Sequence, residues 1–304
     1  PTYDANSFPS VPRDAQRNRA ITDTYEPGST FKLVTVAGVL SERLVSPSTT
    51  FTLPYQIHVS DRWIHDADPR GTVTYSVAQI LAHSSNVGAI TLAQILTRQA
   101  KGVAYWISRF GFGHKTGIDF PGESAGIVVP PDKWSGSTIG NVPIGQGIAV
   151  TPMQMASAYA AIANGGVWTR PHLVDRVGDG LAKPVFRRRI VTRWIARELT
   201  SMLQNVVLDG TGTLAQIPGY HVAGKTGTAA KPDPRGGYST SKYVASFVGF
   251  APATRPRVVV LVTVDEPQGA IWGGVVAAPA FKEIAQQTLQ YLSAPPDAPG
   301  STSP

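Results

Sequence analysis

The chain has 304 residues, 42% of them hydrophobic, which is enough to build a packed globular core rather than a disordered chain. The absence of cysteine excludes disulfide frameworks, thiolate metal sites and cysteine nucleophiles. The formal net charge of +7 favours anionic neighbours. The densest basic cluster, Arg187–Arg189, matches no nucleic-acid-binding motif, so we expect a solvated surface and no nucleic-acid partner.

Helical patterns dominate the first two thirds of the chain. Residues Pro1–Arg17 are rich in turn formers and predict a loop, and an apolar pattern from Ser29 to Leu40 predicts a helix that starts just after Glu26-Pro27-Gly28. Ser76–Leu96 predicts two helical pieces with a break at Ser84-Ser85-Asn86. Further along, the patterns predict a loop over Gly111–Gly126 and helices over Thr151–Asn164 and Ile195–Leu208.

The period then changes to that of strands. Three consecutive strands are predicted over Gly219–Ala229, Tyr243–Ala251 and Arg255–Val264, with a closing helix over Ala278–Leu292. Helices followed by an antiparallel meander predict an α+β fold. We assign residues 1–292 to one domain and 293–304 to a disordered tail, and we expect a mobile hairpin loop over 231–242 beside the site.

Three short motifs carry the chemistry. They are Ser29-Thr30-Phe31-Lys32, Ser84-Ser85-Asn86 and Lys225-Thr226-Gly227, in that order. Ser29 and Lys32 are three residues apart, which places both on one helix face. A serine hydroxyl needs a base, and a lysine whose pKa is lowered by burial or by nearby cations supplies one. Taken alone, this spacing also fits a capping serine and a surface lysine.

The other two motifs suit substrate handling. Ser84 could relay a proton to a leaving amine, and Asn86 could hydrogen-bond a substrate amide, although such residues are also usual at turns. The third motif ends a predicted strand, whose edge can pair with an extended peptide. There Lys225 offers a cation to a carboxylate and Gly227 allows close approach of a backbone.

An oxyanion site is expected between two of these motifs. The backbone N–H groups of Thr228 and Ser29 are the donors that we assign to it. A second Lys-Thr-Gly tripeptide, Lys115–Gly117, stands in loop sequence with no hairpin after it, so we assign the functional tripeptide to Lys225–Gly227. No metal-ligand spacing occurs, so we predict no metal and no cofactor. His83, His221, Tyr243 and Trp272 stand near these motifs or the predicted hairpin, although structural roles are commoner.

The sequence around the motifs strongly resembles that of class B penicillin-binding proteins over residues 1–292. Four stretches carry the resemblance: Arg17–Ser29, Gly111–Glu123, Gly145-Gln146-Gly147 followed by Thr151–Ala156, and Ser246–Pro252. The Thr-Asp-Thr-Tyr-Glu-Pro-Gly stretch is more similar to the division branch, or its sporulation relative, than to the elongation branch. The resemblance implies the penicillin-binding, serine β-lactamase-like fold, with an antiparallel sheet between helices plus a helical subdomain. It also implies that the family's first two sheet strands are missing here.

The resemblance implies a peptidoglycan D,D-transpeptidase. Ser29 would form an acyl-enzyme with D-Ala-D-Ala stem peptides, with Lys32 as base, and Ser84 and Lys225 would assist protonation of the leaving D-Ala. Asn86 and Thr226 would position the substrate, and β-lactams would acylate Ser29. The implied partners are stem peptides, β-lactams, a division glycosyltransferase and an upstream N-terminal segment. The implied place is extracytoplasmic, with a transmembrane anchor outside this sequence.

Other readings share parts of the pattern. A serine β-lactamase needs a deacylating glutamate between the second and third motifs, where only Glu123 and Glu198 occur, neither in a recognisable loop of that kind. A D,D-carboxypeptidase shares the first half-reaction, and a β-lactam sensor module acylates without turnover. A Ser-His-Asp hydrolase is disfavoured because no histidine falls in a nucleophile-elbow context.

Overall fold

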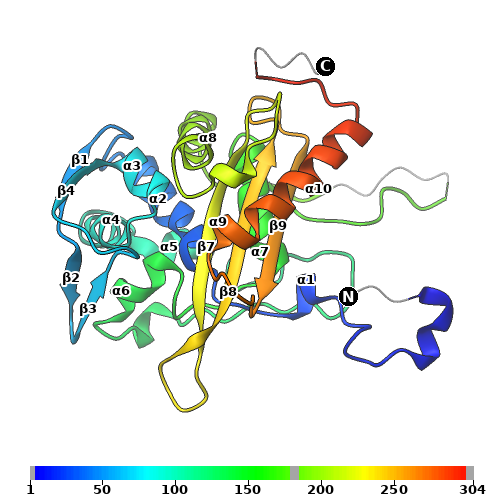
Figure 1. The fold of residues 1–304 in the computed structure, drawn as a ribbon, viewed down its shortest axis with the longest axis horizontal. Coiled ribbons are helices and arrows are strands. Elements are labelled where there is room, and N and C mark those ends of the chain that lie inside the picture. Colours follow the sequence, from blue (N-terminus) through cyan, green and yellow to red (C-terminus); the bar gives the residue numbers. More distant parts are fainter. Residues whose placement is uncertain (1–3, 179–184, 299–304) are drawn as a thin grey trace.

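The computed structural model describes residues 4–178 and 185–298. A three-stranded antiparallel sheet, in the order β7-β8-β9, lies at its centre with helices on both faces (Figure 1). The strands follow one another in the chain as β7 (Ala223–Pro232), β8 (Tyr238–Ala251) and β9 (Val258–Asp265). The α+β fold class and the predicted meander are therefore confirmed.

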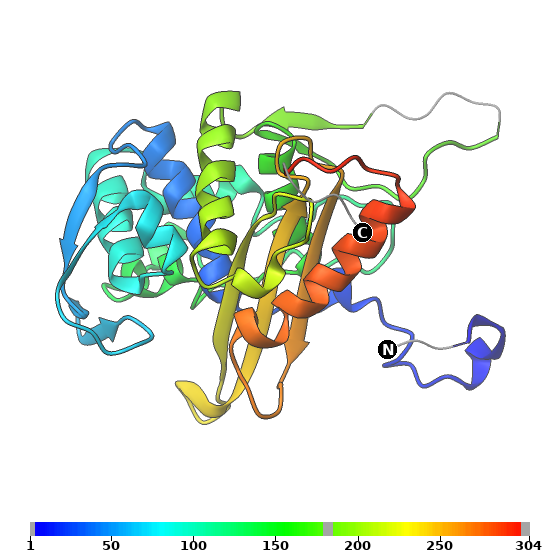
Figure 2. The same ribbon diagram turned by 45° about the horizontal axis from the view of Figure 1, so that its top comes forward.

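Each face of the sheet has its own hydrophobic cluster, because side chains alternate along a strand. Val260 and Val262 of β9 pack with α10 (Ala278–Tyr291), whereas Val259 and Leu261 pack into the larger cluster on the opposite face. The larger cluster includes α7 (Pro152–Ala163) and α8 (Arg193–Leu208), and the short helix α9 (Gly273–Val276) lies beside α10 (Figures 1 and 2).

A helical subdomain flanks the sheet on the side of β7. Its helices are α2 (Lys32–Ser41), α3 (Val77–Ala82), α4 (Asn86–Gln99), α5 (Gly102–Phe110) and α6 (Thr138–Asn141). Two two-stranded sheets close its outer side (Figure 1): β1 (Thr50–Leu53) with β4 (Val73–Ser76), and β2 (Gln56–Val59) with β3 (Arg62–His65). The functional motifs lie where this subdomain meets the sheet.

The long helices agree with the sequence predictions, and the break between α3 and α4 falls at Ser84-Ser85 as expected. The chain start differs, since a 3₁₀ helix spans Ala5–Ser10 and a short helix α1 spans Arg19–Thr22. The small strands β1 to β4, β5 (Val167–Thr169) and β6 (Arg187–Arg189) were not predicted. Strands of three or four residues are too short to show a period.

The segment predicted as a loop after the third motif is largely strand. β7 continues to Pro232 and β8 begins at Tyr238, so the two strands form a hairpin that projects beyond the sheet (Figure 1). The loop prediction over 231–242 was therefore wrong for most of its length, since β7 and β8 extend into it and Pro232 pairs with Tyr238 beyond an irregularity in the register. Its mobility stays a prediction.

The two ends of the domain are less regular. Asp297 accepts hydrogen bonds from His221 N (2.7 Å) and Thr254 Oγ1 (2.7 Å), and the Tyr220 hydroxyl donates to Ala294 O (2.7 Å). Thus the predicted disordered tail is packed over residues 293–298, while 299–304 lie outside the described residues. Within the described chain, β9 pairs only with β8, and no helix is long and apolar enough to cross a membrane.

Candidate active site

Ser29 lies in a 3₁₀ turn, η2 (Gly28–Phe31), directly before α2. The turn is held against the rest of the protein on two sides: the buried Tyr159 hydroxyl of α7 donates to Thr30 O (2.9 Å), and Gly28 N donates to Gly145 O (3.1 Å). The Ser29 hydroxyl itself makes no hydrogen bond with any described residue. Ser29 lines the cleft.

Lys32 is fully buried one turn further on. Its Nζ donates to Asn86 Oδ1 (2.7 Å), to Ser84 Oγ (3.1 Å) and to the Ser84 carbonyl. Burial lowers the pKa of Lys32 to about 7, and the nearby Asp66 carboxylate opposes this only in part. A lysine whose pKa is lowered towards neutrality can act as a general base at this position.

The second motif is shaped by a residue that the sequence analysis missed. Asp66 accepts hydrogen bonds from Ser85 Oγ (3.0 Å), from the backbone N–H of Asn86 and from Val87 N (3.0 Å), and it pairs with Arg70. It thereby caps the N-terminus of α4. Ser84 has a positive φ of 58°, so the chain turns sharply and presents Ser84 and Asn86 to Lys32.

The third motif lies on β7, the edge strand beside the cleft. Lys225 is fully buried, and its Nζ donates to the carbonyl (3.3 Å) and hydroxyl (3.2 Å) of Thr226. Burial, followed by repulsion from Lys32, holds the pKa of Lys225 well below its usual range. The Thr226 hydroxyl also pairs with Thr211 Oγ1 (2.7 Å), and Thr228 Oγ1 accepts from Gly273 N (3.1 Å).

Gly227 is required by the close approach of β7 to the turn η2, which carries Ser29 and is called the nucleophile turn after the role expected for that residue. A Cβ at this position would lie 2.8 Å from Pro27 O and 2.4 Å from Ser246 Oγ. Any larger residue would push β7 away from Ser29. The structure places Gly227 in close packing beside the cleft and outside its lining, whereas the sequence analysis expected it to let a substrate backbone approach.

A cleft of about 420 Å³ joins the three motifs. The predicted site residues that line it are Ser29, Ser84, Asn86, Thr226 and Thr228, while Lys32, Lys225 and Gly227 do not line it. Further lining residues include His83, Gln146, Thr211 and Trp272. Of the four residues noted near the motifs in the sequence, His83 and Trp272 line the cleft. The other two do not line it: His221 Nδ1 lies 3.6 Å from Asp297 Oδ1, and the Tyr243 hydroxyl donates to Thr240 O.

The second Lys-Thr-Gly tripeptide forms a carboxylate-binding loop. Thr116 N (2.7 Å) and Gly117 N (2.9 Å) donate to the two oxygens of the buried Glu123. Its exclusion from the site is therefore supported, since Lys115–Gly117 does not line the cleft. Glu123 accepts the hydrogen bonds of this loop, and Glu198 lies on α8. Neither glutamate lines the cleft, so neither is positioned to act as a deacylating base.

Comparison with known proteins shows the family of this chain. The family model described as the penicillin binding protein transpeptidase domain matches residues 1–286. The chain belongs to the penicillin-binding protein transpeptidase family. This transpeptidase domain is 37% identical to penicillin-binding protein PbpB of Mycolicibacterium smegmatis, over 97% of this chain and 48% of that protein.

Two further matches point the same way. The peptidoglycan D,D-transpeptidase FtsI of Escherichia coli K12 is 36% identical over 98% of the transpeptidase domain and 49% of that protein. The crystal structure of penicillin binding protein 3 from Mycobacterium tuberculosis with aztreonam matches with a TM-score of 0.87 and 36% identity, covering 96% of this chain and 69% of that one. The chain thus spans about half the length of the curated relatives it matches.

Proposed function

We propose that the chain is the catalytic domain of a peptidoglycan D,D-transpeptidase that works through an acyl-enzyme on Ser29. The observation that carries the proposal is the buried Lys32, whose pKa is lowered to about 7 and which bonds to the second motif beside the nucleophile turn. A surface lysine in a chance Ser-x-x-Lys pattern would have neither property.

In the proposed first half-reaction, neutral Lys32 accepts the Ser29 hydroxyl proton while Oγ attacks the carbonyl carbon of the penultimate D-Ala. The negative charge that develops on the carbonyl oxygen is met by the backbone N–H groups of Ser29 and Thr228, and each such donor is typically worth about 10²- to 10³-fold in rate. The C–N bond to the terminal D-Ala then breaks, and its nitrogen takes a proton through Ser84, assisted by Lys225.

In the second half-reaction, the amine of a neighbouring stem peptide attacks the Ser29 ester. The amine loses a proton to Lys32, the Ser29 oxygen recovers one, and a new amide bond cross-links the two stems. We assign substrate positioning to Asn86, Thr226 and Thr228, which line the cleft, while Gly227 lets β7 lie close to Ser29. β7 is an edge strand, and such a strand can pair with an extended peptide. β-Lactams would acylate Ser29 by opening their ring.

The wider setting is proposed from the relatives. A stem-peptide substrate lies on the outer face of the cytoplasmic membrane, so we propose that the domain works there, anchored through sequence outside this chain. We propose a cell-division role with a glycosyltransferase partner, on the likeness to FtsI.

The test is the intact mass of the 304-residue chain after incubation with benzylpenicillin. We expect one persistent adduct that maps to the peptide containing Ser29, and none in Ser29→Ala. Adduct formation that persists in Ser29→Ala would overturn the nucleophile assignment. A short-lived adduct with consumed drug would indicate a β-lactamase, and a stem-peptide assay that yields only free acid despite an added amine would indicate a carboxypeptidase.

A further inference from the structure

Gln146 reaches the catalytic cleft from a loop that is held on both sides. The carbonyl of Gly145 accepts from Gly28 N (3.1 Å), and the N–H of Gly147 donates to Glu26 Oε1 (3.0 Å). Both partners belong to the short segment that leads into Ser29. The position of Gln146 relative to the nucleophile is therefore set by two contacts, one of them to a side chain.

That side chain, Glu26, also holds the β7–β8 hairpin. The hydroxyl of Tyr238, the first residue of β8, donates to Glu26 Oε1 (3.2 Å). One carboxylate oxygen of Glu26 thus accepts hydrogen bonds from two segments that are each more than 100 residues from it along the chain. The hairpin projects from the sheet (Figure 1), and its base is also held by ion pairs of Lys231 with Asp265 (2.9 Å) and Glu266 (2.8 Å).

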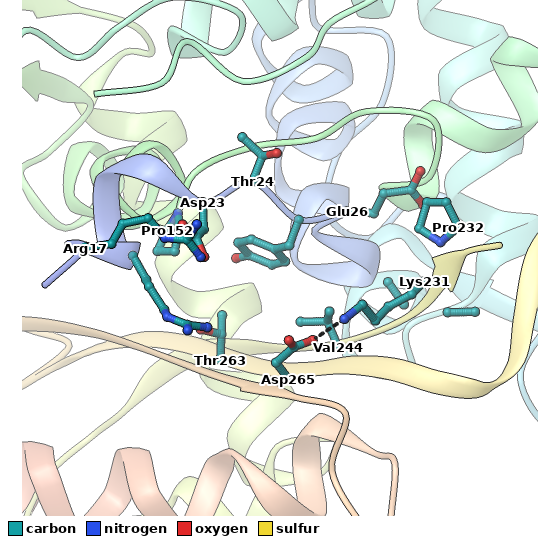
Figure 3. Close-up of a pocket in the computed structure, with 14 residues that line it drawn as sticks. Arg17, Asp23, Thr24, Glu26, Pro152, Lys231, Pro232, Val244, Thr263 and Asp265 are labelled. Carbon is teal, nitrogen blue, oxygen red and sulfur yellow. Dashed lines mark hydrogen bonds and ion pairs between the residues drawn. The ribbon is translucent and has the colours of Figure 1, made fainter. Parts of the chain in front are cut away.

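The surroundings of Glu26 do not neutralise its charge. Its second oxygen, Oε2, is buried and has no hydrogen-bond partner among the described residues. Glu26 borders a cavity of about 480 Å³ behind the nucleophile segment, in which Lys231 turns to Asp265 (2.9 Å) rather than to Glu26 (Figure 3). Burial is the main cause that raises the pKa of Glu26, against the two hydrogen bonds.

A half-buried carboxylate without a cation costs stability. We therefore look for the role of Glu26 in the two groups that its oxygen binds, the Gly147 amide and the Tyr238 hydroxyl. We propose that Glu26 is a positioning residue of the transpeptidase reaction: through the Gly147 amide and the Tyr238 hydroxyl, it fixes Gln146 and the β7–β8 hairpin relative to Ser29. Glu26 does not line the catalytic cleft and acts only through these neighbours. The inference rests on the proposed function.

The experiment separates the hydrogen-bond acceptor from the charge. Glu26→Gln keeps an acceptor oxygen of the same reach, whereas Glu26→Ala removes it. For acylation by benzylpenicillin we expect the first-order rate constant to fall about 10²-fold in Glu26→Ala, as misplacement of a site element typically causes, and to stay within about threefold in Glu26→Gln. The dissociation constant of the initial complex should change little. Glu283→Ala and Glu283→Gln, on the exposed side of α10, are the matched controls.

A second readout needs no reaction. Hydrogen exchange of the Gly147 amide and of residues 233–238 should quicken in Glu26→Ala and remain slow in Glu26→Gln. Equal losses in both variants, or no loss in either, would overturn the proposal. If Glu26→Ala does not fold, Tyr238→Phe decides the hairpin contact: unchanged acylation together with unchanged exchange there would overturn it. A wild-type chain that penicillin does not label would refute the proposed function, while the exchange result would still judge the contacts.

Discussion

The chemistry of the cleft depends on one buried amine. Lys32 gains its low pKa from burial, and it reaches Ser84 and Asn86 from a helix that begins one residue after the nucleophile turn. An ammonium can donate to all three acceptors, whereas the neutral amine has two N–H groups and a lone pair. The protonation state of Lys32 therefore sets whether it can accept the Ser29 proton. Lys32 thus links two motifs and is the base of the mechanism that we propose.

This predicts how acylation depends on pH. Below about pH 7 Lys32 is charged and cannot accept a proton, so the acylation rate should rise with pH through a limb centred near 7. Stopped-flow acylation by a chromogenic cephalosporin between pH 5.5 and 9 measures this, with Lys282→Met on the surface of α10 as control. A rate that stays level across that range would contradict the role of Lys32 as base.

The same shift has a consequence for stability. The pKa of Lys32 is lowered on folding, so between about pH 7 and the usual lysine value the unfolded chain binds more protons than the folded one. The contribution of Lys32 to the free energy of unfolding therefore rises with pH through that window. Lys32 costs stability at neutral pH, as catalytic groups often do.

Asp66 tunes this amine from the second motif. Its negative charge raises the pKa of Lys32 against the effect of burial, and it caps α4 through Ser85 and Val87. In Asp66→Asn we expect the acidic limb of the acylation profile to move to lower pH. The free energy of unfolding should fall by about 3 kcal/mol, because Arg70 loses a buried partner.

Urea unfolding and the pH profile check the two parts of this prediction separately. Asp132→Asn, at an exposed position in a 3₁₀ turn, is the control and should match the wild type in both measurements. A limb that moves to higher pH in Asp66→Asn would mean that the Asp66 charge does not act on Lys32.

At the scale of elements, the cleft depends on backbones that approach without side chains between them. Gly145 has a φ of +78°, and a Cβ there would lie 2.1 Å from Gly28 O. Gly145→Ala should therefore both strain the turn and push the loop away from the nucleophile segment. We expect a loss of at least about 3 kcal/mol in urea unfolding and slower acylation.

Gly71 provides the matched control, since an added Cβ would meet nothing within 4 Å and its φ is not in the left-handed region. Gly71→Ala should leave stability and acylation close to those of the wild type. Similar stability for the two variants would show that the loop around Gly145 relaxes without cost, and would remove the packing argument.

Some of these elements were predictable and others were not. The break at Ser84-Ser85-Asn86 and the strand that carries Lys225 were visible because apolar periodicity stops and starts there. Helix α5 could have been found, since Val103, Trp106, Ile107 and Phe110 have helical spacing. Asp66 could not, because nothing local distinguishes it from the neighbouring Asp68. Its role arises from a contact 20 residues away, and such pairings are set by tertiary structure.

At the scale of the whole molecule, Asp297 joins two segments at one end of the central sheet. Asp297 accepts from His221 N, Thr254 N (3.1 Å) and Thr254 Oγ1, which joins the residues before β7 to the turn after β8. The expectation of a tail disordered from residue 293 came from its Pro and Ser content. The composition of the tail could not reveal that the Asp297 carboxylate accepts three hydrogen bonds.

Asp297→Ala should lower the free energy of unfolding by about 2 kcal/mol, because three donors lose their partner. The acylation rate of the folded fraction should not change, since Asp297 does not line the cleft. Thermal unfolding with parallel penicillin labelling makes the measurement, and Glu283→Ala serves as control. Slower penicillin labelling of Asp297→Ala with an unchanged free energy of unfolding would contradict this prediction.

The three motifs reach the cleft from positions 29, 84 and 225, on two parts of the fold that are far apart along the chain. The contacts of α2 with α3 and α4 close loops of about 50 residues, whereas β7 must meet the nucleophile turn across nearly 200. Contacts of long sequence separation form late, because loop closure costs more entropy before it is rewarded. We therefore expect penicillin to label only the fully folded chain, and a nascent or half-folded molecule with an intact helical subdomain to go unlabelled.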